Sequence, residues 1–144
     1  MANSIKTAVE APVEIPSDFN LPIPILPPDQ KYPVNELGQT IVVGIEGSAN
    51  KVGVGVLLYD PSNHSYCTLS NPRKTYIPPC GHGFLPKETA WHHQAHIVSL
   101  VKAALAEAFP DHYNSKNEST KAPIISAVAY TKGPGMGGPL RSCT

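Results

Sequence analysis

The side chains best suited to chemistry lie in a short polar turn between two apolar runs, within Ile41–Leu58. The turn carries one carboxylate, two neutral polar groups and one cation, on Glu46, Ser48, Asn50 and Lys51. Gly44 and Gly47 allow the backbone to bend sharply and to approach a ligand closely. Because such a turn can hold a phosphate on backbone N–H groups, we predict a phosphate-binding turn. An ordinary hairpin with a glycine-rich turn is the alternative that this stretch alone leaves open.

A glycine-rich loop near Thr144 is the second candidate site. Gly133, Gly135 and Gly138 have the GxGxxG spacing directly after an apolar run, which is the form of a dinucleotide fingerprint. The acidic residue that would confirm this fingerprint, about twenty residues further on, falls beyond Thr144. A loop of this kind that leads into a helix also offers N–H groups and a positive dipole end to an anion. We therefore predict that the loop lines a phosphate or substrate site.

Three histidines, His92, His93 and His96, form the third candidate. His92 and His96 are four residues apart, so on a helix both rings lie on one face, as in a zinc-binding helix. The sequence has no HExxH motif at this place, because Gln94 and Ala95 follow His93. Two ligands alone do not make a metal site, so we expect a structural or partner-facing role for these histidines.

A small sheet must position the polar turn. β-Branched runs bounded by glycines predict two strands in Ile41–Leu58. Gly53 and Gly55 alternate with valines there, so one face of the second strand has no side chains, which often marks the approach of a ligand. A third strand at Tyr66–Ser70 completes a β-meander, and a long surface loop follows at Asn71–Pro86. Because a meander lacks alternating helices, a nucleotide-dependent dehydrogenase of the Rossmann type is disfavoured.

One long helix is predicted from Lys87 to Phe109, with Pro86 as its first residue and Phe109-Pro110 as its stop. Its apolar side chains recur at helical spacing and should pack on the sheet. They are Ala90, Ile97, Leu100, Val101, Ala104, Leu105 and Ala108. A buried strand is predicted at Ile124–Tyr130, and the chain reaches Thr144 on the first turn of a further helix. The pattern indicates an α/β fold with a mixed sheet, in which a β-meander precedes a helix and a strand.

The length of 144 residues suits a single domain, and a net charge of +0 provides no global basic field for nucleic acid. Cys67, Cys80 and Cys143 are far apart and form no CxxC, which indicates neither a disulfide framework nor a zinc site and favours a reducing compartment. No apolar run is long enough to span a bilayer. We expect a cytoplasmic protein, with the nucleus as a second compartment.

Residues 1–39 are rich in proline, which opposes helix and β-ladder alike and favours extended chain. We predict a disordered leader over residues 1–39 and a folded part over residues 40–144. A docking peptide is the alternative for the leader, because apolar residues such as Ile23, Ile25 and Leu26 lie among its prolines.

Three stretches of the chain resemble one enzyme family in their order and spacing. They are GIEGSANKVGVGV from Gly44, NPRKTYIPPCGHGFLPKETAWHHQAH from Asn71 and YTKGPGMGGPLR from Tyr130. The chain from Ile41 to Arg141 is similar to the N-terminal part of the archaeal and eukaryotic tRNA threonylcarbamoyl-adenosine transferases, the catalytic subunit of the KEOPS complex.

The resemblance implies part of the N-terminal lobe of an actin/Hsp70-like ATPase fold, whose two lobes enclose a divalent metal and ATP or threonylcarbamoyl-adenylate. Family members transfer the threonylcarbamoyl group from its adenylate to the adenosine beside the anticodon, in tRNAs that read codons beginning with A. The resemblance and the pattern together assign the nucleotide cleft to Glu46, Gly47, Ser48, Asn50, Lys51, Gly133, Pro134, Gly135, Met136 and Gly137.

The metal ligands of the family have no counterpart in this chain. The family's HxxxH motif follows the glycine-rich loop and its aspartate lies near the family's C-terminus, both downstream of Thr144, so we assign no metal ligand and no catalytic residue here. The contacts to ribose and base belong to the second lobe. We therefore expect the chain alone to bind neither metal nor nucleotide tightly, and to be a truncated and inactive part of the transferase.

The resemblance implies tRNA as a partner of the complete complex, the small dimerising and kinase-like KEOPS subunits as protein partners, and no membrane. The alternative to a transferase is a non-catalytic fragment that docks the small subunit through the helix Lys87–Phe109. Its exposed side would carry His92, Gln94, Lys102 and Glu107. Part of a lobe should also expose an apolar sheet face and an unpaired strand edge, so we expect low solubility of the chain alone.

Overall fold

The sheet is built around the pairing of β1 (Thr40–Glu46) with β2 (Lys51–Asp60), in a computed structural model that describes residues 32–113 and 122–144. The pairing is antiparallel and places Gly44 opposite Gly55 and Glu46 opposite Gly53. The remaining strands are β3 (Ser65–Ser70), β4 (Arg73–Thr75) and β5 (Ala127–Tyr130). Their order is β3-β2-β1-β5, with β4 also paired to β2. The β-meander predicted from the sequence is confirmed.

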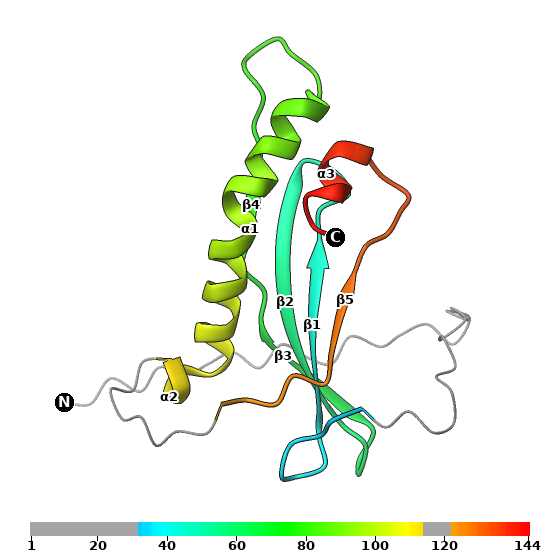
Figure 1. Cartoon of the computed structure of the whole chain (residues 1–144), viewed down its shortest axis with the longest axis vertical. Helices are drawn as coiled ribbons and strands as arrows, with labels where there is room; N and C mark the ends of the chain where they lie inside the picture. Colours follow the sequence, from blue (N-terminus) through cyan, green and yellow to red (C-terminus); the bar gives the residue numbers. More distant parts are fainter. Residues whose placement is uncertain (1–31, 114–121) are drawn as a thin grey trace, which may run out of the picture. The chain divides into compact units, whose positions relative to one another are not determined.

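The helix α1 (Pro86–Ala108) covers one face of this sheet (Figure 1). Val52, Val54 and Val56 alternate along β2 and are fully buried on that face. Leu100 and Ala104 of α1 complete the core that these valines form. Since burying one such aliphatic side chain stabilises a fold by about 1.5–3 kcal/mol, this face holds the helix to the sheet. The predicted apolar spacing of the helix is confirmed, and so is the mixed α/β class.

Two short helices follow α1. The first, α2 (Pro110–Tyr113), begins where proline ends α1, as predicted for Phe109-Pro110. The second, α3 (Gly137–Arg141), occupies the place of the predicted first helical turn near Thr144. Figure 1 shows α3 beside the first turns of α1, where Ser142 Oγ donates to the carbonyl of Ala90 at 3.2 Å.

Two expectations about strands were wrong. The segment Asn71–Pro86 is not entirely loop, because Arg73–Thr75 forms β4 and pairs with Lys51–Gly53 of β2. The last strand is also shorter than Ile124–Tyr130 and is not buried. β5 begins at Ala127 and lies parallel to β1, and on it Val128 is 61% and Tyr130 is 53% exposed. Among the described strands β5 has β1 as its one neighbour, so the expected apolar exposure at a sheet edge is found here.

The described chain starts with a turn that connects to the sheet. Asn35 Oδ1 accepts hydrogen bonds from the backbone N–H groups of Leu37 and Gln39, and Gln39 Nε2 donates to Asp60 at 3.1 Å. Residues 1–31, which make up most of the predicted leader, lie outside the described residues. Within the two described ranges, no helix is both long enough and apolar enough to cross a membrane.

Candidate functional site

A groove lies on the sheet face opposite α1, and its floor is made of glycine. It has a volume of about 530 Å³. We call it the groove and define it by its lining residues, Gly44, Ile45, Glu46, Lys51, Gly53, Gly55, Asn71, Arg73, Ala129, Tyr130 and Thr131. Side chains alternate along a strand, so the positions between Val52, Val54 and Val56 point to this face. The predicted side-chain-free face of the second strand therefore forms the bottom of a cavity.

Charged groups of both signs border the groove. Glu46 ends β1, Lys51 begins β2, and Arg73 lies opposite Gly53 in the β2–β4 pairing. Burial raises the pKa of the Glu46 carboxyl, but hydrogen bonds from Ser48 and Thr131 oppose this effect and the net pKa is lowered. Glu46 is therefore an anion near neutral pH, with its two oxygens already accepting hydrogen bonds.

Sequence reasoning missed Arg73 and Thr131 as members of this site. Arg73 was placed in an irregular loop, and only the pairing of β4 with β2 brings it to the groove. Thr131 follows β5 directly, its N–H donates to the carbonyl of Ile45 at 3.1 Å and its hydroxyl donates to Glu46. The available signal for Thr131 was its position as the first polar residue after an apolar strand.

The polar turn and the glycine-rich loop meet, as the cleft prediction requires. The N–H of Met136 donates to the carbonyl of Ser48 at 2.8 Å. A Cβ atom at Gly135 would lie 2.6 Å from Cβ of Ser48, so only glycine permits this approach. Gly133 and Gly137 have open space around them instead. The loop thus touches the turn through Gly135 and Met136, while Gly133, Pro134 and Gly137 are exposed.

The three histidines of α1 have separate surroundings. His93 is fully buried, and its Nε2 lies 3.0 Å from the carbonyl oxygen of Ala49 in the β1–β2 turn. His92 is half-buried and its ring packs against Tyr76 and His96, with centroid distances of 5.8 and 4.6 Å. The sequence predicted His92 on the exposed side of the helix. This prediction was wrong, because the ring of Tyr76 packs against His92. Across the two described ranges, no group of three or more metal-ligating side chains is found.

The open side of α1 carries the other proposed docking residues. Gln94, Lys102 and Glu107 are exposed. Two apolar side chains that sequence reasoning did not assign lie on the same helix, Trp91 at 56% and Val98 at 63% exposure. Residues 91, 94, 98 and 102 share one helical face by their spacing.

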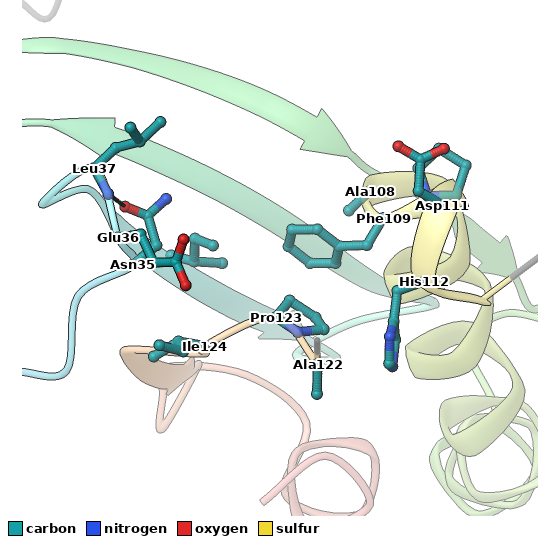
Figure 2. A pocket seen from close by; sticks show the side chains of 12 residues that line it. Asn35, Glu36, Leu37, Ala108, Phe109, Asp111, His112, Ala122, Pro123 and Ile124 are labelled. Carbon is teal, nitrogen blue, oxygen red and sulfur yellow. Dashed lines mark hydrogen bonds between the residues drawn. The ribbon is translucent and has the colours of Figure 1, made fainter. Parts of the chain in front are cut away.

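A second hollow of about 460 Å³ lies at the other end of β1. We call it the apolar hollow, and it is lined by Asn35, Glu36, Leu37, Ile41, Ala108, Phe109, Pro110, Asp111, His112, Ala122, Pro123 and Ile124. Figure 2 shows the Phe109 ring pointing from the end of α1 toward Asn35, with Pro123 beside it. The junction of turn and loop lies next to the groove, because Ser48 donates to Glu46 of the groove lining, and we therefore place the candidate site at the groove.

Comparison with known proteins assigns most of the chain to one family. The family model described as tRNA N6-adenosine threonylcarbamoyltransferase matches residues 66–144. Among relatives bearing that name, the protein of Phaeosphaeria nodorum is 48% identical over 102 residues, which cover 71% of this chain and 26% of the relative. The zebrafish (Danio rerio) protein is 50% identical over 101 residues, which cover 70% of this chain and 25% of the relative.

A solved structure, YeaZ from Pseudomonas aeruginosa, superposes with a TM-score of 0.42 at 15% identity, covering 72% of this chain and 35% of that chain. A likeness of that size assigns no function. The chain spans about a quarter of the length of the relatives it matches. The chain belongs to the tRNA N6-adenosine threonylcarbamoyltransferase family.

Proposed function

We propose that this chain supplies the first part of the nucleotide cleft of a tRNA threonylcarbamoyltransferase. The enzyme would move the threonylcarbamoyl group from its adenylate to the adenosine beside the anticodon. The observation that carries this proposal is the junction of two glycine-bearing segments next to the groove, where the N–H of Met136 donates to the carbonyl of Ser48 and Ser48 in turn donates to Glu46 of the groove lining. Residues 40–144 would form part of the N-terminal lobe of an actin/Hsp70-like fold, in a protein of the cytoplasm and the nucleus.

The groove suits the phosphates of a nucleotide. Lys51 and Arg73 bring positive charge to its border, and the glycine floor lets a ligand approach the backbone of β1 and β2. Among the described residues that line the groove, Glu46 is the one anion, and its oxygens are engaged with Ser48 and Thr131. A triphosphate or an adenylate would therefore be held by cations and backbone N–H groups, with its remaining contacts supplied by other parts of the enzyme.

The described residues fit a nucleotide better than they fit the divalent metal of the family. No described cluster provides three ligating side chains, and the three histidines of α1 are held by Ala49, Tyr76 and one another. In the complete enzyme the metal would neutralise phosphate charge, and its ligands would come from sequence beyond Thr144. This chain's own contribution is to bind and orient phosphates.

A transfer assay tests the proposal. A family-length protein that carries this segment, supplied with its partner subunits, should attach threonylcarbamoyl to tRNAs that read codons beginning with A, measured by mass spectrometry of nucleosides. The variants Lys51→Gln and Arg73→Gln should raise the KM for adenylate, while Lys102→Gln on the open side of α1 should leave that KM unchanged at saturating concentrations of the partner subunits. A complete protein that is inactive with all partners present would refute the proposal.

Docking of the small KEOPS subunit is a second candidate function, and the exposed Trp91 and Val98 favour it. Apolar side chains on an otherwise polar helix face are typical of a protein-binding surface. Changing Trp91, Gln94 or Lys102 to alanine or glutamate should weaken binding of the small subunit, measured by calorimetry. Unchanged binding by the double variant Trp91→Glu/Val98→Glu would remove the basis of this second function.

A further inference from the structure

Three consecutive carbonyl groups of the β1–β2 turn accept hydrogen bonds from three different segments. The Ser48 carbonyl accepts from the glycine-rich loop at 2.8 Å, and the Asn50 carbonyl accepts from the N–H of Tyr76 at 2.7 Å. The Ala49 carbonyl between them accepts from His93 at 3.0 Å. His93 is the one side chain among these three donors, so it holds the middle of the turn.

The contacts of His93 determine its tautomer. A carbonyl oxygen can only accept, so Nε2 of His93 carries the hydrogen that binds Ala49. Its Nδ1 lies 3.2 Å from Nδ1 of His92, so a neutral His93 accepts there while His92 donates. Burial lowers the pKa of His93, although hydrogen bonds to the backbone of Ala49 and Lys51 and the nearby Glu46 charge act in the opposite direction. Burial therefore favours the neutral ring that this arrangement needs.

The turn is also packed directly on the His93 ring. A Cβ atom at Gly47 would clash with Sγ of Cys143 and would come within 3.2 Å of Cδ2 of His93. The ring is fully buried at this contact. Because neither side can shift without opening the core, the hydrogen bond to Ala49 has a fixed direction.

The fixed carbonyl orients the next amide. In a trans peptide unit the C=O and the following N–H point in opposite directions. The Ala49 carbonyl points toward His93 on α1, so the N–H of Asn50 points toward the other face of the sheet. The groove lies on that face, bordered by Lys51 at the next position.

We infer that His93 is a positioning residue for phosphate recognition: through the Ala49 carbonyl it aims the Asn50 N–H at an oligophosphate in the groove. This inference rests on the proposed phosphate-binding role of the turn. His93 itself touches no ligand, since the turn lies between its ring and the groove. The chemical class of ligand is an oligophosphate, as found in a nucleoside triphosphate.

Two amide side chains of different reach test this role in the full chain of 144 residues. In His93→Gln the side-chain nitrogen takes the place of Nε2 and still reaches the Ala49 carbonyl, whereas in His93→Asn it is too short. Inorganic tripolyphosphate is titrated and followed by NMR chemical shifts, which report weak binding. Amide hydrogen exchange is measured in parallel, without ligand, at Met136 and Tyr76, whose N–H groups donate to the neighbouring carbonyls of the turn.

The glutamine variant should bind tripolyphosphate within about twofold of the unchanged chain, while the asparagine variant should bind about tenfold more weakly, the range expected for a lost hydrogen bond. Exchange at Met136 and Tyr76 should rise only in the asparagine variant. Equal binding and equal exchange in both variants would overturn the inference, and so would a glutamine variant as impaired as the asparagine variant. If the unchanged chain binds no tripolyphosphate, the proposed phosphate role of the turn fails, and the exchange rates alone decide whether His93 fixes the peptide.

Discussion

The groove and the apolar hollow lie at opposite ends of β1, and both are a few hundred cubic ångströms in volume, 530 and 460 Å³. Glu46 contributes to the first and Ile41 to the second. The groove exists because side chains are missing from its floor. Its border carries charges, and the turn next to it has three consecutive carbonyls engaged in hydrogen bonds. The apolar hollow exists where the end of α1 meets two loops, and its central group is the aromatic ring of Phe109 (Figure 2).

The difference shows that volume alone does not indicate a site. In the proposed site, the turn beside the groove has the carbonyls of Ser48, Ala49 and Asn50 engaged, which would leave the N–H of Asn50 for an anion. In the apolar hollow, the proline and isoleucine side chains offer apolar contact area but no directional hydrogen bonds. Substitutions made at one end of β1 or at the other should therefore show which changes affect ligand binding and which affect folding.

The largest effect is expected at Gly135. Valine at this position would collide with Ser48, so the glycine-rich loop must leave the turn. We expect a loss of about 1–3 kcal/mol in the free energy of unfolding, as for other overpacked contacts, together with complete loss of tripolyphosphate binding. Gly83→Val is the matched control, because a Cβ atom there meets nothing within 4 Å and Gly83 is not among the predicted cleft residues. Equal denaturation midpoints for the two variants would show that the loop does not depend on this contact.

Filling the two hollows separately should give the next largest effect. Leucine in place of Gly55 would occupy the groove from its floor, where a Cβ atom makes only ordinary contacts at 3.7 Å or more. Leucine in place of Ala108 would occupy the apolar hollow, by a smaller step because alanine already has its Cβ atom. We expect a drop in tripolyphosphate affinity on the order of tenfold for the first variant and none for the second, measured by NMR titration. Weaker binding in Ala108→Leu would mean that the apolar hollow takes part in phosphate recognition.

The charges bordering the groove should contribute less. Arg73→Gln and Lys51→Gln each remove one exposed cation, for which we expect about threefold weaker binding. The effect should shrink as ionic strength rises, because salt screens exposed charges over roughly 8–10 Å. Lys102→Gln changes the net charge by the same amount, but on the open side of α1, and should leave tripolyphosphate binding unchanged at any salt concentration. A uniform loss in all three variants would indicate attraction by net charge instead of a site at the groove.

The sequence was sufficient for those parts of the fold that follow from local pattern. The alternation of valine and glycine in β2 predicted both the buried face and the empty one, and the apolar spacing of α1 predicted its packing. The pairing of β4 was not predictable, since a strand of three residues in a proline-flanked segment carries little strand signal and depends on its pairing with β2. The strand after Pro123 was drawn too long because an apolar run does not show which of its residues finds a partner.

The residues of the candidate site were likewise predictable only in part. Ser48, Gly135 and Met136 were predicted to share a cleft, and the structure brings them together through the family's spacing of turn and loop. Arg73 depended on an unforeseen strand and Thr131 on the direction of a hydroxyl group. His93 was expected to be structural or partner-facing, and its contact with Ala49 spans 44 positions of sequence, which helical periodicity cannot reveal.

The smallest expected effect is a dependence of stability on pH that is confined to the groove end. Burial lowers the pKa of His93 below its usual value near 6.5, so the unfolded chain binds this proton more readily than the folded chain. The stabilisation is therefore present above pH 6.5 and is lost as the pH falls through the lower folded-state pKa, with a slope of at most about 1.4 kcal/mol per pH unit. A protonated His93 would direct a second N–H at His92, so exchange at Met136 and Tyr76, whose N–H groups donate to the turn, should rise first. The Phe109 amide beside the apolar hollow should stay protected by its hydrogen bond to Leu105. His93→Gln has no titrating ring and should abolish the early loss; an unchanged pH profile in that variant would assign the effect to another group, with His92, whose pKa is also lowered by burial, as the next one to change.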